Sequence, residues 1–451
     1  MNVGIHAIAF DIPRIYLPIE TLAQARAIEP EKLTFGLGLK KMTFTDTYQD
    51  TVTMAANAAL KLIRQEGLQP EEISRIYVGT ESGVDSSKPV ASYVIQLLEQ
   101  QLGNRAFANC DAVDLTFACI GAVDALQNSL DYVRLNPNKK AIVIAADYAK
   151  YDLESTGEYT QGAGAIALLI TSNPNLLIFE SAVGVGTEGV FDFFKPRRTV
   201  SKSTVTQDDS NPEWNGVLEA EIQFFKEQPV FDGQYSNQCY ISRITEAYEH
   251  FKKESNQPGK VYEQWEGIFM HLPYCFQGRR TFVEIFAKEN PELLAQQPGE
   301  NAKEQWKALS KSQEYKSLVN SKIAPTEIAS GQVGNIYTGS IFLGMLSALS
   351  YHASQQTDLT GKKVGFIAYG SGSKSKVFEA TVAPNWSTST LKSKLFETLE
   401  NSTPISMEVY EQLHKKERKQ PVLSPKKEFA LKHIETENPA LVGARYYEFV
   451  E

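Results

Sequence analysis

The residue whose type and setting most favour covalent chemistry is Cys119. The apolar residues 112–115 predict a short strand, and the apolar spacing of residues 121–133 predicts a helix, so Cys119 lies where a helix begins. A helix N-terminus presents unsatisfied N–H groups and a partial positive charge, which should depress the thiol pKa. The same amides could hold an oxyanion. We therefore predict that Cys119 is a nucleophile that carries an acyl group; a buried structural cysteine is the alternative.

Two further polar residues directly follow predicted strands. Glu81 follows the strand of residues 73–80, and His271 follows the strand of residues 267–270. Ligands of open α/β sheets bind at the carboxyl ends of the strands, and a carboxylate there can act as a general base. The alternatives are an exposed loop acid for Glu81 and a structural histidine for His271.

Asn335 lies between a glycine and an apolar helix predicted for residues 340–352, where it could bind a substrate or cap the helix. The glycine-rich residues 159–164 lead into a strand and not a helix, which argues against a phosphate-binding loop or a dinucleotide fingerprint. The sequence contains no cluster of His, Cys, Asp and Glu with metal-ligand spacing, so we expect no metal site.

The elements that must position these residues alternate along the chain. The predicted strands and helices of the first part are residues 3–10, 50–65, 73–80, 90–102, 112–115, 121–133, 140–147 and 162–170. This alternation predicts a largely parallel sheet covered on both faces. A looser repeat follows, with strands at 267–270 and 363–369 and helices at 240–253, 276–288 and 340–352. Residues 196–228 and 290–325 read as insertions on a two-lobed body, and residues beyond about 385 as a C-terminal packing segment.

Length and composition narrow the class of protein. A chain of 451 residues is too long for one ordinary core. Its net charge of −9 argues against general nucleic-acid binding. No apolar run approaches the roughly 20 residues that span a bilayer, and the N-terminus lacks a basic region followed by an apolar stretch, so we expect no membrane association and a cytoplasmic location. The four cysteines have no CxxC pairing, which argues against a disulfide framework.

Nine short motifs, spread from residue 78 to residue 372, occur together. They are Val78–Ser82, Phe117–Gly121, Thr160–Ala165, Phe191–Pro196, Asp232-Gly233 with Ser236, Gln238–Tyr240, Met270–Cys275, Val333–Thr338 and Tyr369–Gly372. In this order they resemble the 3-hydroxy-3-methylglutaryl-CoA synthase family, the condensing enzymes of the mevalonate pathway. The resemblance extends from the first strand to about residue 382, and residues 444–450 look like the last strand of the family.

The resemblance implies a fold and an assembly. The implied fold is thiolase-like: two similar α/β halves in a five-layered αβαβα arrangement. The N-terminal half, residues 1–175, would hold Glu81 and Cys119, and the C-terminal half, residues 176–451, would hold His271 and Asn335. The resemblance also implies a homodimer that needs no cofactor and takes acetyl-CoA and acetoacetyl-CoA as substrates.

The resemblance also assigns roles to individual residues. Cys119 would be acetylated by acetyl-CoA, Glu81 would remove a proton from the acetyl methyl group, and His271 would polarise the ketone of acetoacetyl-CoA. Water would then release 3-hydroxy-3-methylglutaryl-CoA. The implied substrate-binding residues are Tyr151, Thr160, Ser236, Arg280, Asn335 and Ser371.

One position departs from the animal type of the family, in which basic residues after the histidine help to hold the CoA nucleotide. Phe276 stands at the first such position, so Arg280 becomes the predicted phosphate contact, with Lys40 or Lys41 as weaker candidates. The loss of this charge is a point in favour of a polyketide β-branching synthase, which uses the same chemistry on an acceptor bound to a carrier protein.

Other members of the superfamily fit the sequence less well. A thiolase would need a second cysteine near the last strand, and no cysteine follows Cys275. A Cys–His–Asn ketoacyl synthase would not need Glu81. A catalytically dead homologue is disfavoured because all four functional positions hold competent residues.

Overall fold

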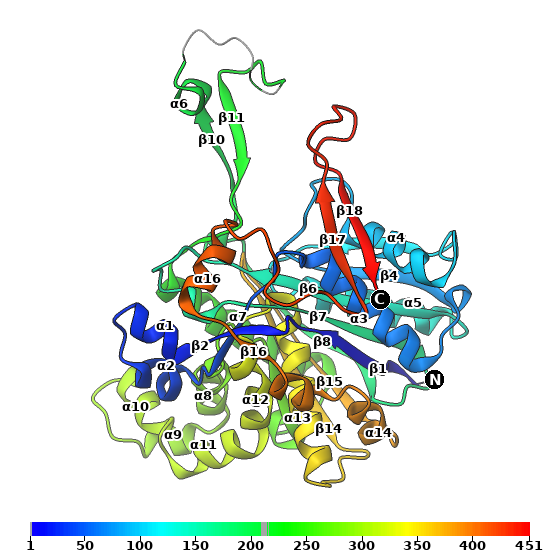
Figure 1. Ribbon diagram of the computed structural model, residues 1–451. Coiled ribbons are helices and arrows are strands. Elements are labelled where there is room, and N and C mark those ends of the chain that lie inside the picture. Colours follow the sequence, from blue (N-terminus) through cyan, green and yellow to red (C-terminus); the bar gives the residue numbers. More distant parts are fainter. Residues whose placement is uncertain (1, 209–213, 215) are drawn as a thin grey trace.

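The computed structural model describes residues 2–208, 214 and 216–451, and its centre is a nine-stranded sheet (Figure 1). Along the sheet the strands are β13 (Trp265–Met270), β14 (Lys363–Gly370), β15 (Lys374–Val382), β8 (Leu177–Thr187), β1 (Val3–Asp11), β7 (Gly162–Ser172), β6 (Lys140–Ala149), β4 (Ile73–Gly79) and β5 (Asp111–Leu115).

The order of these strands repeats. In the first half the order is β5-β4-β6-β7-β1, and in the second half it is β13-β14-β15-β8, the same order without a counterpart of β5. The two halves meet where β1 pairs with β8 through Gly4 and Ile5. This repeat supports the predicted fold of two similar α/β halves.

The prediction of a largely parallel sheet is wrong. β4 is parallel to β5 and β6, and β13 is parallel to β14, but β7 and β15 each run antiparallel to both of their neighbours. The reason is that β6 and β7, like β14 and β15, are joined without an intervening crossover helix of the kind that parallel strands need.

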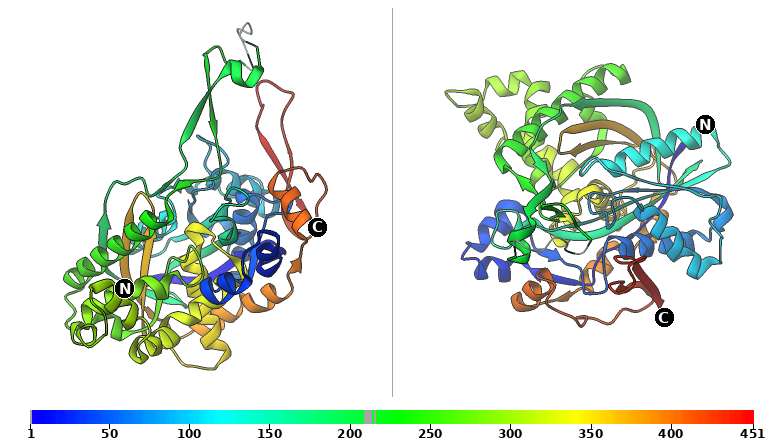
Figure 2. Two further views of the ribbon diagram at one scale, coloured as in Figure 1. Left: turned by 90° about the vertical axis from the view of Figure 1, so that its left-hand side faces the viewer. Right: turned by 90° about the horizontal axis from the view of Figure 1, so that it is seen from above.

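Helices lie on the outer face of each half of the sheet and between the two halves, which gives the five predicted layers (Figure 2). α3 (Thr51–Glu66) and α4 (Val90–Leu102) share one core with β1, β4, β6 and β7. α5 (Gly121–Leu135) and α13 (Ser340–Ser354) share the central core with strands of both halves. α7 (Gly233–Ser255) and α8 (Gln277–Glu289) cover the outer face of the second half. Side chains of β6 alternate between the two faces of the sheet: Val143 and Ala145 contact the central core, whereas Ile142 and Ile144 contact the outer one.

Local signals in the sequence set where several of these helices begin and end. Asp50 and Thr53 form a capping box at the start of α3, and Gly67 ends that helix in the left-handed conformation, with φ 61°. α7 begins at Gly233, earlier than predicted, because the Asp232 side chain accepts hydrogen bonds from the amides of Gln234 and Tyr235.

The two predicted insertions have structure of their own. Residues from the first form a hairpin of β10 (Arg197–Ser201) and β11 (Glu221–Phe225), with α6 (Lys202–Thr206) following β10. In Figures 1 and 2 this hairpin projects from the same face of the molecule as β17 (Glu428–Ile434) and β18 (Arg445–Val450). The second insertion contains α9 (Pro291–Ala295), α10 (Ala302–Leu309), α11 (Gln313–Leu318) and the π-helix η4 (Val319–Ile323).

The remaining elements extend the two halves. A small sheet contains β2 (Ile15–Pro18), β3 (Lys41–Thr43) and β16 (Thr403–Pro404), and β9 (Phe193–Phe194) pairs with β12 (Val230–Phe231). The further α-helices are α1 (Ile19–Ala25), α2 (Pro30–Leu37), α12 (Ala324–Val333), α14 (Trp386–Leu391), α15 (Leu395–Glu400) and α16 (Met407–His414). The 3₁₀ turns are η1 (Pro70–Glu72), η2 (Glu158–Thr160), η3 (Val261–Gln264) and η5 (Tyr337–Gly339). Among the described residues, no helix combines the length and apolarity required to cross a bilayer.

The packing of α7 on β8 gives a stability test. A Cβ atom at Gly184 would lie 2.1 Å from the carbonyl oxygen of Ala247 and 2.3 Å from the amide nitrogen of Phe251. Because both contacts are backbone atoms, we expect Gly184→Ala to destabilise the protein by about 1–3 kcal/mol, as overpacking does. The midpoint of urea unfolding measures this loss.

Gly189→Ala is the matched control, since a Cβ there meets no atom within 4 Å. Equal midpoints for the two variants would contradict the packing argument.

Candidate active site

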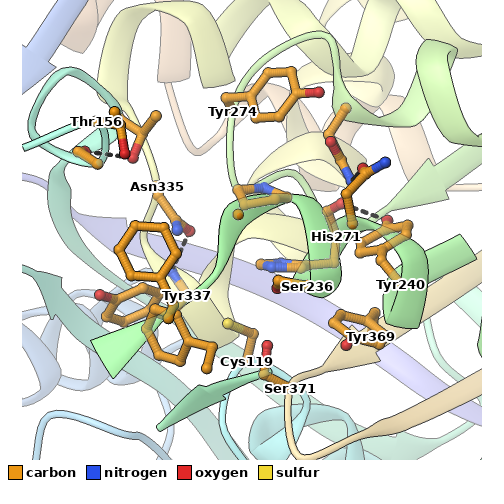
Figure 3. A pocket seen from close by; sticks show the side chains of 18 of the residues that line it. Cys119, Thr156, Ser236, Tyr240, His271, Tyr274, Asn335, Tyr337, Tyr369 and Ser371 are labelled. Carbon is orange, nitrogen blue, oxygen red and sulfur yellow. Dashed lines mark hydrogen bonds between the residues drawn. The ribbon is translucent and has the colours of Figure 1, made fainter. Parts of the chain in front are cut away.

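A cavity of about 330 Å³ contains Cys119 and collects most of the predicted site residues. Its lining includes Cys119, Tyr151, Thr160, Ser236, His271, Arg280, Asn335 and Ser371. Figure 3 shows Cys119, His271, Asn335 and Ser371 pointing into it from different elements. Both halves of the fold therefore supply side chains to one cavity.

Cys119 lies in a tight turn between β5 and α5. Ala118 before it has φ 39°, in the left-handed region that is unfavourable for a residue with a side chain. The end of β14 packs closely on this turn, because a Cβ at Gly370 would lie 2.6 Å from the carbonyl oxygen of Phe117. Glycine at 370 thus lets the second half approach the turn that carries Cys119, and it places Ser371 in the cavity.

The Cys119 thiol donates a hydrogen bond to Oε1 of Glu81 at 3.0 Å. Only 8% of Cys119 is exposed. Burial, followed by the negative charge of Glu81, raises the thiol pKa well above its ordinary value. The predicted depression of this pKa is therefore wrong for the free protein: desolvation of the thiolate and a neighbouring carboxylate outweigh the helix N-terminus. The thiol is protonated at neutral pH, and Glu81 is placed to accept its proton.

Glu81 is fixed by Asp147, a fully buried acid at the end of β6. One oxygen of Asp147 accepts hydrogen bonds from the Glu81 amide at 2.9 Å and from the hydroxyls of Thr80 and Ser82. Its other oxygen accepts from the amide and hydroxyl of Thr338, at 3.0 and 2.5 Å. Burial and the charge of Glu81 raise the pKa of Asp147 to about 6.

His271 lies at the end of β13 with 3% of its surface exposed. Its backbone is held on both sides, since its amide donates to the carbonyl of Ile367 and its carbonyl accepts from the hydroxyl of Tyr240. Within the described part of the chain, Nδ1 of the ring has no hydrogen-bond partner. Burial lowers the His271 pKa to about 3, so the imidazole is neutral and offers one N–H donor and one acceptor.

Asn335 is buried beside Thr160, whose carbonyl accepts the Asn335 amide hydrogen at 2.9 Å. Its side-chain Oδ1 accepts from the Tyr337 amide at 2.9 Å and from the Ser340 hydroxyl at 3.1 Å. The oxygen thus accepts hydrogen bonds within the turn before α13, close to the helix-cap role that the sequence offered as an alternative. The side-chain NH₂ group can still donate hydrogen bonds to a ligand.

Around Cys119 the cavity is mostly aromatic. Tyr151 and Tyr337 are buried against the cysteine, with Phe193 and Phe231 packed beside them. Thr160 and Ser236 add hydroxyl groups to the cavity, where Thr160 donates to the Gly157 carbonyl at 2.8 Å and Ser236 to Asp192 at 3.4 Å. Such a lining suits a small acyl group and excludes bulk water.

Arg280 is the basic residue of this cavity lining and is exposed. It donates to the carbonyl of Gly36 at 2.6 Å and lies 5.6 Å from the centre of the Tyr274 ring. Lys41 is engaged elsewhere, since it donates to the carbonyl of Leu399 at 3.0 Å. Phe276 packs against Gly38, and the guanidinium of Arg279 lies 3.9 Å from the centre of its ring.

Sequence reasoning missed two residues of this site. Asp147 ends an apolar predicted strand, the same signal that singled out Glu81, and could have been found on that ground. Lys195 lies in one of the nine motifs but received no role, although its ammonium lies 3.4 Å from Oε2 of Glu81. Among the residues that the structure describes, no group of three or more His, Cys, Asp or Glu side chains could hold a metal ion.

Comparisons with known proteins identify the family that this chain resembles. Residues 1–175 match the family described as hydroxymethylglutaryl-coenzyme A synthase N terminal, and residues 221–447 match its C-terminal counterpart. The hydroxymethylglutaryl-CoA synthase of Enterococcus faecalis is 32% identical over 412 residues, covering 91% of each chain. That of Haloferax volcanii is 32% identical over 436 residues, covering 92% of this chain and 91% of the relative.

A solved structure, MvaS in complex with 3-hydroxy-3-methylglutaryl coenzyme A, superposes with a TM-score of 0.82 at 29% identity. The superposition covers 100% of this chain and 99% of that chain.

The raised thiol pKa has a direct consequence for reactivity. Because the thiolate forms only at high pH, we expect alkylation of Cys119 by iodoacetamide to keep accelerating as the pH rises past about 8.5, the ordinary thiol pKa. Glu81→Gln removes the neighbouring charge, so the rise should begin at lower pH. Mass spectrometry of the Cys119 peptide measures the rate.

Glu31→Gln, at an exposed acid on α2, is the control and should leave the curve unchanged. A rate that is already constant near neutral pH in the wild-type protein would show that the thiol is not held protonated.

Proposed function

The chain belongs to the hydroxymethylglutaryl-CoA synthase family, and we propose how its residues divide the reaction of that family. The enzyme condenses acetyl-CoA with acetoacetyl-CoA and water to give 3-hydroxy-3-methylglutaryl-CoA and CoA, a step of the mevalonate pathway. The observation that carries the division of roles is the contact of the Cys119 thiol, which lines an acyl-sized cavity, with the Glu81 carboxylate.

The first step is acetylation. Glu81 accepts the thiol proton as the sulfur attacks the acetyl-CoA carbonyl, and the C–S bond to CoA breaks. That proton goes to the leaving CoA thiolate, which leaves as the free thiol. An acetyl thioester then stands on Cys119 among Tyr151, Tyr337 and Phe193.

The second step makes the carbon–carbon bond. The acetyl methyl carbon is two bonds from the sulfur, and Oε1 of Glu81 lies 3.0 Å from that sulfur, so the carboxylate can take a methyl proton. The resulting enolate attacks the ketone carbon of acetoacetyl-CoA. The neutral imidazole of His271 donates a hydrogen bond to the ketone oxygen, which becomes an alkoxide and receives the proton that Glu81 holds.

The last step is hydrolysis. Water adds to the thioester on Cys119, the C–S bond breaks, and the free carboxyl group of the product forms. Asn335 and Ser371 line the cavity together with Cys119 and are placed to hold the acceptor thioester or its ketone. Arg280 is the proposed contact of the CoA phosphates.

The proposal includes the assembly and the compartment. A homodimer is supported by the family resemblance and by β5, which ends the sheet and carries Val113 with 38% of its surface exposed. A cytoplasmic location is supported by the CoA substrates. Acetyl-CoA and acetoacetyl-CoA enter as substrates.

Glu81→Ala separates the two half-reactions. Removing the base should leave acetylation of Cys119 measurable but lower the condensation rate by about 10²–10⁴-fold, the contribution of a positioned general base. Labelled acetyl-CoA followed by peptide mapping measures acetylation at Cys119, and release of 3-hydroxy-3-methylglutaryl-CoA measures condensation.

Glu180→Ala, at an exposed acid of β8, is the control and should behave as wild type. Label on another cysteine, or normal condensation by Glu81→Ala, would refute the assigned roles.

The polyketide β-branching alternative differs in the acceptor. Because Arg280 lines the cavity, we expect kcat/KM for acetoacetyl-CoA to exceed that for an acetoacetyl-carrier protein by about tenfold or more, equivalent to one phosphate contact of about 1.4 kcal/mol. Steady-state kinetics with both acceptors measures the ratio. A preference for the carrier protein would assign the chain to the alternative.

A further inference from the structure

Lys195 is a buried cation in contact with the proposed base. Its side chain is 11% exposed, and Nζ lies 3.4 Å from Oε2 of Glu81, whose own side chain is 6% exposed. The same ammonium donates to the backbone carbonyl of Glu81 at 3.3 Å and lies 4.5 Å from the centre of the Tyr337 ring. The ammonium therefore contacts both the carboxyl group and the backbone of Glu81. It lies on the side of Oε2, while Oε1 accepts a hydrogen bond from the Cys119 thiol.

The segment that carries Lys195 is fixed at several points. Asp192 is fully buried and accepts from the Tyr369 hydroxyl and the Gly372 amide, both at 2.6 Å. Phe193 packs its ring against Tyr337 and Phe231 at 5.9 Å between centroids. Because the second half holds this segment, Lys195 connects the second half to Glu81 of the first.

Lys195 does not line the cavity that contains Cys119. With Glu81 it lines two other cavities, whose linings do not include Cys119. Glu81 contacts the Cys119 sulfur directly, through Oε1 at 3.0 Å, whereas Lys195 contacts the other carboxyl oxygen of Glu81. Lys195 therefore acts on the acyl group chiefly through Glu81.

The charges around Glu81 explain why a cation is needed there. Titratable groups that contact Glu81 or interact with it electrostatically include Cys119, Asp147, Tyr151, Lys195 and Tyr337. Asp147 is acidic and shares the buried space, and the cysteine and tyrosines become negative when ionised. Lys195 is the cation of this set. Two buried carboxylates cannot both be ionised cheaply without a counter-charge.

We infer that Lys195 is a positioning residue that holds the Glu81 carboxyl group and directs its Oε1 toward the acyl group on Cys119. The inference rests on the proposed role of Glu81 as base. When Glu81 takes the methyl proton, the C–H electron pair passes to the enolate and the carboxyl becomes neutral. Lys195 keeps its proton throughout and then remains as the counter-charge of Asp147, so the surroundings of Glu81 do not gain an uncompensated charge.

Lys195→Met tests the inference, because methionine keeps the length of the side chain and removes the charge. In this variant the acetyl group on Cys119 should exchange its methyl hydrogens with deuterated solvent about 10²-fold more slowly near neutral pH. The loss follows because Oε2 of Glu81 no longer has the ammonium contact that directs Oε1 toward the acyl group. Mass spectrometry of the acetylated peptide measures exchange across the pH range.

Two further results are expected from the same variant. KM for acetoacetyl-CoA should stay within about twofold of wild type, since Lys195 is outside the acyl cavity, whereas kcat should fall with exchange. Lys195→Arg restores the charge and should recover most of the rate. Wild-type exchange in Lys195→Met, or an equal loss in Lys195→Arg, would overturn the inference.

Lys252→Met is the matched control for loss of an ion pair. Lys252 pairs at 2.5 Å with Glu289, whose side chain is 7% exposed, on helices α7 and α8. This variant should exchange like the wild type. Glu81→Ala separates the present inference from the proposed function. Normal exchange in Glu81→Ala refutes the base itself, whereas wild-type exchange in Lys195→Met refutes only the role of Lys195.

Discussion

The structure of the site depends on one buried carboxylate, that of Asp147. It accepts hydrogen bonds from Thr80, Glu81 and Ser82 at the end of β4 and from Thr338 before α13. These donors belong to the two halves of the fold, so one side chain fixes the distance between the loop of Glu81 and the loop of Asn335. Hydrogen bonds to a charged acceptor stabilise by about 1.5–3 kcal/mol each, which offsets part of the cost of burying the charge.

Burial of so many ionisable groups gives the site its chemistry. Burial raises the pKa of Cys119 and of Asp147 and lowers that of His271. Each shift favours the neutral form of its group, so the resting site holds a thiol and a neutral imidazole. We expect the thiol to give its proton to the neighbouring carboxylate only when the sulfur attacks a carbonyl carbon. The neutral imidazole can donate a hydrogen bond without the cost of burying another charge.

The sequence predicted where the strands and helices lie along the chain better than it predicted which of them contact one another. Strand and helix periodicity located β1, β4 and β6 and the helices between them, and strand ends pointed to Glu81 and His271. The direction of β7 and the start of α7 were missed, because both depend on connections and caps that periodicity does not report. The sign of the Cys119 pKa shift was also missed, since Glu81 is 38 residues away in sequence and burial has no local signature. The role of Lys195 was missed because its contact with Glu81 joins residues 114 positions apart in the sequence.

The repeat of the fold explains why four such residues meet. Glu81 follows β4 and His271 follows β13, and these two strands hold the same place in the repeated order. Cys119 precedes α5 and Asn335 comes shortly before α13, the two helices that share the central core. Each half thus has one functional residue after a strand and one before a central helix, but the side chains at these positions differ between the halves. The first half supplies a carboxyl group and a thiol, and the second half supplies two neutral hydrogen-bonding groups. The repeated order of the fold places the four positions, and their different side chains give the two halves of the site different chemistry.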